Sequence, residues 1–154
     1  MDDRLRIPQD EAYFRCLGLA TFAFARLEWN AVWCCERLQP GYILTIEAKK
    51  KTAGAIGKDL QSLFSRVVDP TLRTKIVPFA EEFRKVVEER NGLLHGKPGT
   101  APSGDQRLFR NGIEWSIGAI DGFSDRCVVA SLPLNALLYG EFKDPSLVVL
   151  KPSV

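Results

Sequence analysis

The chain contains few of the residues from which metal centres and disulfide frameworks are built. Histidine occurs once, as His95, and the four cysteines form no paired Cys-x-x-Cys ligand sets. Asp and Glu are spread along the sequence without a dense cluster. We therefore expect no dedicated zinc site and no tightly held metal or other cofactor. The thiols are expected to be buried and free, since the adjacent Cys34 and Cys35 cannot easily bond each other.

The chain also has no long hydrophobic run. Its longest uncharged apolar stretch, residues 16–25, is about half of the ~20 residues that a membrane-spanning helix needs. The amino-terminal residues mix acidic and basic side chains and lead into no signal-like apolar segment. These features predict a cytoplasmic location with no membrane partner.

Length and composition indicate one globular domain over residues 1–154, because 45% of the 154 residues are hydrophobic and no long polar tract or repeat divides them. The net charge of +2 and the pI of about 8.4 are too mild to indicate a nucleic-acid surface. Basic residues nevertheless gather at positions 49–51 and around Arg107 and Arg110.

The first half of the chain is predicted to be helical. Residues 10–38 contain no proline and only Gly18, and apolar residues lie on almost every side, which predicts one long helix in a central or interfacial place. A second helix is expected over about residues 45–68, loosened by two internal glycines. Asp69 and Pro70 form a typical start for a third helix, which Pro78 should kink or restart near position 77.

The second half mixes turn and strand signals with a last helix. Residues 96–104 are rich in glycine and proline and read as a flexible loop, whereas residues 106–117 surround an Asn-Gly pair and predict a β-hairpin. A last helix is expected over about residues 124–139, bent or split at Pro133, followed by an extended tail over about 143–154. The fold class predicted is a mostly α bundle of four to five helices with a small hairpin inserted before the last helix.

A single cation interrupts the apolar face of the third helix. Arg90 continues a stripe with spacings of four and three, made by Leu72, Ile76, Phe79, Phe83 and Val86. An unpaired guanidinium on an apolar face is costly, so Arg90 must meet an anion, a partner side chain or a second subunit. Glu28 or another buried acid is a candidate for a purely structural ion pair with it.

The polar face of the same segment carries Arg84, Glu88, Asn91 and His95, again at spacings of four, three and four. Gly96 follows, so His95 should lie at the helix C-terminus, where the helix dipole favours the imidazolium ion. A histidine in this place can simply cap the helix. Beside Arg90 and Asn91, it can also act as a proton donor or acceptor.

The sequence Arg90-Asn91-x-x-x-His95 resembles the Arg-polar-x(3–5)-His motif of the HEPN superfamily, and the helical order over residues 10–142 is loosely similar. The resemblance implies a HEPN-like helical bundle that acts as a homodimer, with the paired motifs meeting at the dimer interface. It also implies a metal-independent RNA endonuclease, of the kind found in toxin–antitoxin and defence systems. A nucleotidyltransferase-like antitoxin would then be a partner protein.

For the individual residues, the resemblance implies that His95 relays protons while the RNA 2′-hydroxyl attacks the adjacent phosphate, which gives a cyclic phosphate. Arg90 would stabilise charge on the phosphate oxygens, Asn91 would orient the substrate or the motif partner, and Lys97 would add weak phosphate attraction. The alternative is a helical module without catalysis, in which Arg90 and His95 stabilise a dimer or bind a nucleotide or a partner protein.

Overall fold

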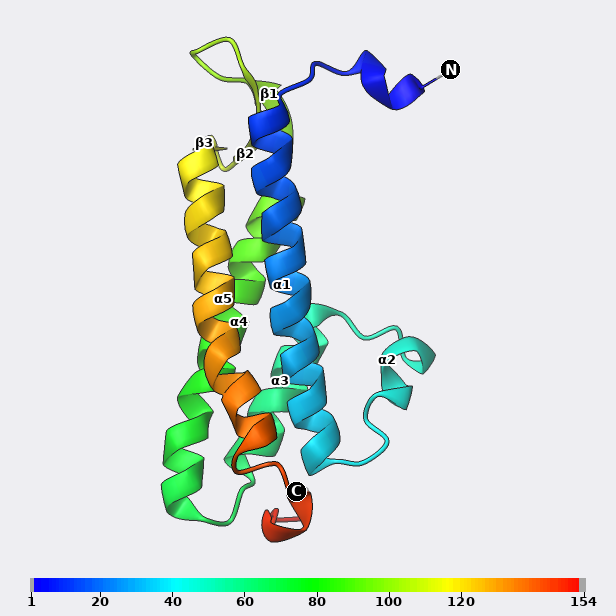
Figure 1. Ribbon diagram of the computed structural model, residues 1–154, viewed down its shortest axis with the longest axis vertical. Coiled ribbons are helices and arrows are strands. Elements are labelled where there is room, and N and C mark those ends of the chain that lie inside the picture. The colour runs from blue at the N-terminus through cyan, green and yellow to red at the C-terminus, as the bar shows by residue number, and fades with distance from the viewer. Residues whose placement is uncertain (1, 153–154) are drawn as a thin grey trace.

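The computed structural model describes residues 2–152 and consists mainly of long helices that lie side by side. In Figure 1, α1 and α5 form the layer nearest the viewer, and α3 and α4 lie behind them. The predicted fold class, a helical bundle with a small hairpin before the last helix, is confirmed. The main helices are α1 (Glu11–Leu38), α3 (Ala53–Ser65), α4 (Pro70–Leu94) and α5 (Ile117–Tyr139).

The first predicted helix is confirmed as α1, with Asp10 as its N-cap. The Asp10 carboxylate accepts a hydrogen bond from the backbone N–H of Tyr13 at 3.0 Å, which satisfies a donor that the helix itself leaves free. One face of α1 is buried, chiefly against α5 and α3. Cys16, Cys34, Cys35 and Cys127 are all buried and free, as predicted.

The second predicted helix, over residues 45–68, is wrong in its extent. The structure has a short α2 (Leu44–Ala48) and then α3, with a break at the lysine run rather than at the glycines. Lys50 adopts a positive φ of 46°, and Lys51 turns inward to an ion pair of 2.6 Å with Asp59. Thr52 then caps α3 by accepting from the N–H of Ala55. These tertiary contacts and the new cap outweigh the helical tendency of the lysines.

Helix α4 starts as predicted, because the Asp69 carboxylate accepts hydrogen bonds from Thr71 and Leu72 and Pro70 occupies the first turn. The predicted restart near position 77 does not occur, and α4 continues through Pro78. Pro78 and Thr74 are both exposed, so water can reach the Thr74 carbonyl that loses its helical donor. Pro133 likewise lies within the unbroken α5.

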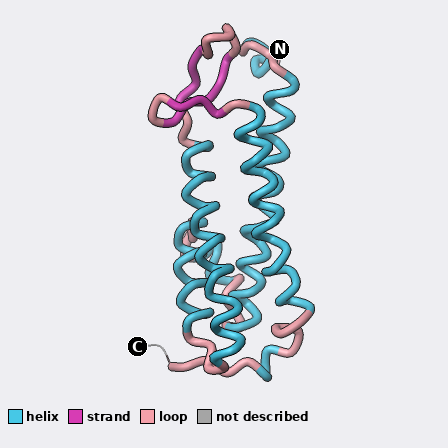
Figure 2. Tube along the Cα trace, turned by 90° about the vertical axis from the view of Figure 1, so that its left-hand side faces the viewer, coloured by secondary structure: helices cyan, strands magenta, loops and turns pink. Residues whose placement is uncertain are grey.

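A three-stranded antiparallel sheet covers one end of the bundle (Figure 2). Its strands are β1 (Lys97–Thr100), β2 (Gln106–Arg110) and β3 (Ile113–Trp115). The predicted hairpin is therefore confirmed as β2 and β3, and its two turn residues both have positive φ, 52° at Asn111 and 76° at Gly112. The predicted loop over residues 96–104 is wrong in part, because β1 pairs with β2.

The last helix begins earlier than predicted, at Ile117, because Ser116 acts as its N-cap and accepts from the N–H of Ala119. Beyond α5 a 3-10 turn (Pro145–Leu147) leads to a β-bridge between Leu150 and Val67. No helix within residues 2–152 is long and apolar enough to span a membrane.

Candidate functional site

Arg90 lies in the buried stripe of α4, as the sequence predicted, and points toward α1. Ile76, Phe83 and Val86 of the same stripe are buried. The guanidinium carbon of Arg90 stands 5.1 Å from the centre of the Phe24 ring, a cation–π arrangement. A groove between α1 and α4 surrounds it, and its lining includes Phe24, Ala25, Glu28, Trp29, Arg90 and Leu94.

The guanidinium of Arg90 is only partly satisfied. Its Nη1 donates a hydrogen bond of 3.1 Å to Oδ1 of Asn91, so the structure brings these two predicted site residues together. Its Nε is buried and has no hydrogen-bond partner among the described residues. A buried donor without an acceptor is costly and uncommon in proteins. The groove therefore holds a cation with an unused N–H group.

Glu28 faces the same groove. Among the described residues, however, no ion pair of 4.0 Å or less joins Glu28 to Arg90. Burial raises the pKa of the Glu28 carboxyl, and the positive charge of Arg90 opposes that rise only in part. The purely structural ion pair considered from the sequence is thus not formed. An anionic ligand could occupy the groove without displacing a close ion-pair partner of Arg90.

His95 ends α4, as predicted, and its backbone N–H donates to the Asn91 carbonyl at 3.1 Å. Its side chain is exposed, and no interaction within the described residues joins it to the side chain of Arg90 or Asn91. Five helical residues correspond to a rotation of roughly 140° about the axis, so Arg90 and His95 leave α4 in different directions. One chain therefore pairs Arg90 with Asn91 but not with His95. Lys97 is exposed in β1.

Two residues of the hairpin that the sequence did not identify as site residues pack on the motif itself. A Cβ atom placed on Gly92 would lie 3.5 Å from Cζ2 of Trp115 and 3.9 Å from Cγ of Arg110. The Nη1 of Arg110 also stands 3.5 Å from the carbonyl oxygen of His95, at the limit of a hydrogen bond. The Asn-Gly signal predicted the hairpin, but its docking on α4 depends on tertiary packing that periodicity does not report.

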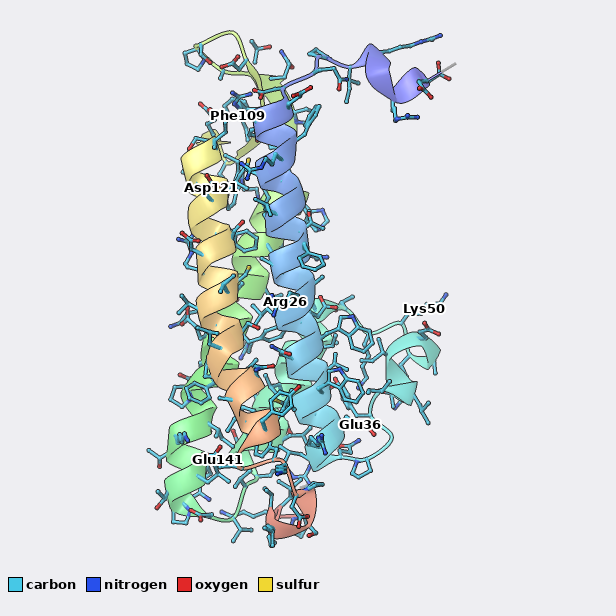
Figure 3. The ribbon with its side chains drawn as sticks, viewed as in Figure 1. Arg26, Glu36, Lys50, Phe109, Asp121 and Glu141 are labelled. Atoms are coloured by element: carbon cyan, nitrogen blue, oxygen red, sulfur yellow. The ribbon has the colours of Figure 1, made fainter. Side chains whose placement is uncertain are left out.

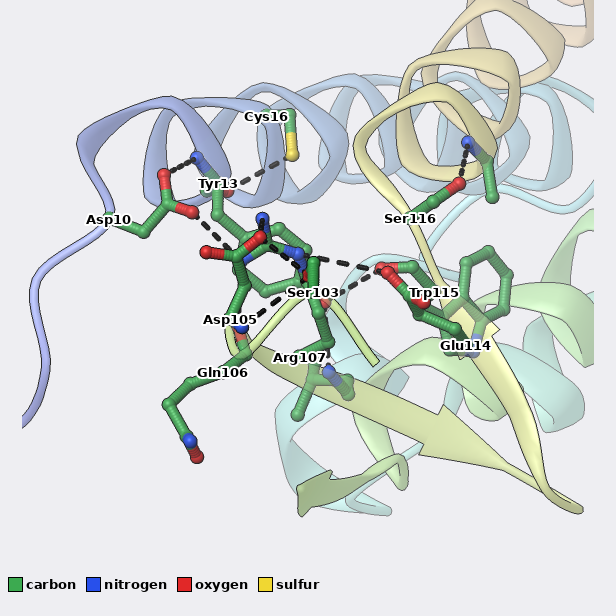
Figure 4. A network of polar contacts seen from close by, with 12 residues as sticks. Asp10, Tyr13, Cys16, Ser103, Asp105, Gln106, Arg107, Glu114, Trp115 and Ser116 are labelled. Atoms are coloured by element: carbon green, nitrogen blue, oxygen red, sulfur yellow. Dashed lines mark hydrogen bonds and ion pairs between the residues drawn. The ribbon is translucent and has the colours of Figure 1, made fainter. Parts of the chain in front are cut away.

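Arg107, by contrast, is fully engaged in holding the sheet to α1 (Figure 4). Its side chain is only 9% exposed and lies 2.8 Å from Asp10 and 3.3 Å from Asp105. Its guanidinium also lies over the Tyr13 ring, and the Tyr13 hydroxyl accepts from the N–H of Leu108. The Tyr13 N–H, and to a lesser degree Arg107, hold the pKa of Asp10 below its usual value, although burial opposes them. Of the two arginines predicted to cluster here, only Arg110 is free of carboxylate partners among the described residues.

An apolar surface extends along the layer formed by α1 and α5, and we call it the α1/α5 face. Figure 3 shows the outward side of this layer, where Arg26 and Asp121 are labelled. The exposed large apolar side chains of the face are Leu19, Phe22, Trp29, Trp33, Val128 and Leu132. A shallow groove between the two helices includes Leu19, Phe22, Val128 and Leu132 in its lining. Apolar side chains that gather on the surface of a folded chain are a feature of interaction sites.

Comparison with known proteins gives no match: no family model, no curated sequence and no solved structure is significantly similar to the chain. The geometry around Arg90 and His95 therefore carries the functional argument by itself.

Proposed function

We propose that the protein is a metal-independent RNA endonuclease of HEPN type that acts in the cytoplasm as a toxin or defence component. The proposal depends on one observation: Arg90 lies in a groove, and the Nε–H group of its guanidinium is buried without an acceptor among the described residues. A phosphate oxygen would supply that acceptor once the Arg90 side chain turns toward the groove, and arginine presents its donors in a planar fork that suits phosphate.

The reaction would use side chains alone for proton transfer and charge stabilisation. His95 accepts the proton of the RNA 2′-hydroxyl, whose oxygen then forms a bond to the adjacent phosphorus. The bond from phosphorus to the 5′-oxygen breaks, and that oxygen takes up the proton that His95 relays, which leaves a 2′,3′-cyclic phosphate and a 5′-hydroxyl. General acid–base catalysis of this kind contributes about 100- to 10,000-fold. Arg90 stabilises the phosphate oxygens, Asn91 orients Arg90, and Lys97 adds long-range attraction.

The proposed enzyme is a homodimer, because Arg90 and His95 diverge within one chain and a second copy can bring a His95 toward the Arg90 groove. Two features support this arrangement. Trp29 and Leu94, both about half exposed, line the groove that holds Arg90. The α1/α5 face adds further apolar surface that a second copy could cover.

The decisive experiment is RNA cleavage in the presence of EDTA by the wild type and by the His95→Ala, Arg90→Ala and Arg84→Ala variants. Arg84 is the matched control, because it lies on α4 and bonds to Gln61 instead of facing the Arg90 groove. We expect activity to fall at least 100-fold for His95→Ala and Arg90→Ala and to persist for Arg84→Ala. The products should carry cyclic phosphate and 5′-hydroxyl ends. Cleavage that survives both motif substitutions would remove this site from the mechanism.

The second candidate function is a helical interaction module without catalysis. Two observations favour it, the extent of the α1/α5 face and the exposed His95 side chain without a partner among the described residues. Such a module would bind a partner protein, for which a nucleotidyltransferase-like antitoxin is the expectation from the HEPN resemblance. A folded wild type that cleaves no RNA, but associates through the α1/α5 face, would favour the module.

A further inference from the structure

We infer that the cleft between the β2–β3 hairpin, α4 and α5 binds one unpaired nucleobase of RNA, and this inference rests on the proposed ribonuclease function for its substrate. The cleft has a volume of about 410 Å³, and its lining includes Glu89, Arg110, Glu114, Trp115, Gly118 and Gly122. Small-molecule sites typically measure about 300–1,000 Å³, so the cleft has room for a base.

Helix α4 contributes Glu89, the neighbour of Arg90, to the lining of the cleft, and the cleft and the Arg90 groove have no lining residue in common. Gly92, between Asn91 and Leu93, provides the bare helix surface on which Trp115 and Arg110 rest. Arg110 lines the cleft and also reaches the backbone carbonyl of His95. A nucleotide whose base enters the cleft therefore has its sugar and phosphate near the end of α4, where His95 is exposed.

The walls of the cleft suit a flat heteroaromatic ring. The Trp115 indole is half-buried and packs edge-to-face on Phe123, with 6.4 Å between ring centres, so its orientation is fixed. Aromatic and guanidinium planes are the surfaces on which proteins stack unpaired RNA bases. Across the cleft, Gly118 leaves open space, because an added Cβ atom there would meet nothing within 4 Å.

The polar groups at the cleft favour a base that offers N–H donors. The Glu114 carboxylate is about one-third exposed, and Arg107, which forms a long ion pair of 3.8 Å with it, is already engaged by Asp10. A carboxylate accepts two parallel hydrogen bonds, and guanine presents two adjacent donors where uracil presents one. Two cations line the cleft in the described part of the chain. Arg126 is occupied by Glu89, whereas Arg110 is available to the phosphate.

The test is calorimetric titration of the full chain with GMP and with UMP, which carry a base but no linkage to cleave. The Gly118→Leu variant fills the cleft, and Gly54→Leu is its control, because both glycines are exposed second residues of a helix. We expect the wild type to bind GMP about tenfold more tightly than UMP. Gly118→Leu should weaken GMP binding by about tenfold or more, and Gly54→Leu should leave it unchanged, with circular dichroism confirming that both variants are folded.

The inference is overturned if the wild type binds no GMP, or if folded Gly118→Leu binds it as the wild type does. Its failure is separable from failure of the proposed function. RNA cleavage that depends on His95 but is indifferent to Gly118→Leu in rate and base preference would reject the cleft alone. GMP binding that follows the expected pattern in a chain without nuclease activity would support the cleft and reject the ribonuclease.

Discussion

Replacing Gly92 by alanine is expected to stabilise the protein, whereas the same replacement at Gly96 is expected to destabilise it. Gly92 lies in the last turns of α4, and its added Cβ atom would make ordinary contacts of 3.5 Å with Trp115 and 3.9 Å with Arg110. Alanine loses less conformational entropy than glycine when it enters a helix, and this difference is about 0.5–1 kcal/mol. The new contacts with Trp115 and Arg110 are at van der Waals distance, so no steric clash offsets this gain in stability.

Gly96 has no such space. Its added Cβ atom would lie 3.0 Å from Cβ of Leu108 and 3.0 Å from the carbonyl oxygen of Leu93. Neither atom can rotate away, since one belongs to the backbone and the other is fixed by strand β2. Overpacking of this kind costs about 1–3 kcal/mol.

Urea unfolding followed by circular dichroism measures both changes. The two variants should differ in free energy of unfolding by about 1.5–4 kcal/mol, with Gly92→Ala above the wild type and Gly96→Ala below it. If Gly92→Ala loses more than about 1 kcal/mol, Trp115 does not rest on α4 as described, and the geometry of the nucleobase cleft fails with it.

Three further outcomes are expected. Because the pKa of Glu28 is raised in the folded state, ionisation of its carboxyl destabilises the fold as pH rises through that pKa. Glu28→Gln should therefore have a higher melting temperature than the wild type at neutral pH. A difference in melting temperature that persists below the ordinary Glu pKa of about 4.3 would contradict this. Tyr13→Phe leaves the Leu108 N–H and the Trp115 carbonyl without their partner and should cost about 1–3 kcal/mol in urea unfolding, whereas the exposed Tyr139 should tolerate the same change. Leu132→Glu places a charge on the α1/α5 face and should convert the wild-type dimer to a monomer in analytical ultracentrifugation. A wild type that is itself monomeric would contradict this prediction.

Local signals predicted the starts of α1 and α4 and the place of Arg90. The Asp10 and Asp69 caps follow from side chains that satisfy the first N–H groups of a helix, which is a local property of the sequence. The apolar period of α4 likewise placed Arg90 on the buried face, because the period of the α-helix is fixed. Both predictions depend on residues within a few turns of one another.

The sheet shows where local signals were insufficient. Residues 97–100 contain Pro98 and Gly99 and read as a loop, yet they pair with β2 because Gly99 lets the Phe109 ring approach closely, at 3.2 Å from its would-be Cβ atom. The docking of Trp115 on Gly92, and the cleft that results, depends on residues more than twenty positions apart. No periodicity reports such a contact, so the cleft could not be predicted from the sequence.

The spacing of the motif itself leads to the last prediction. A four-residue spacing would place two side chains on one face of a helix, whereas the five-residue spacing of Arg90 and His95 separates them. If the active site joins Arg90 of one protomer to His95 of its partner, a heterodimer of the two inactive single variants contains one intact site. Mixing Arg90→Ala with His95→Ala under exchange should then restore about a quarter of the wild-type activity, because about half of the dimers are mixed and each has one site. No recovery after confirmed subunit exchange would show that the proposed site is not divided between chains in this way.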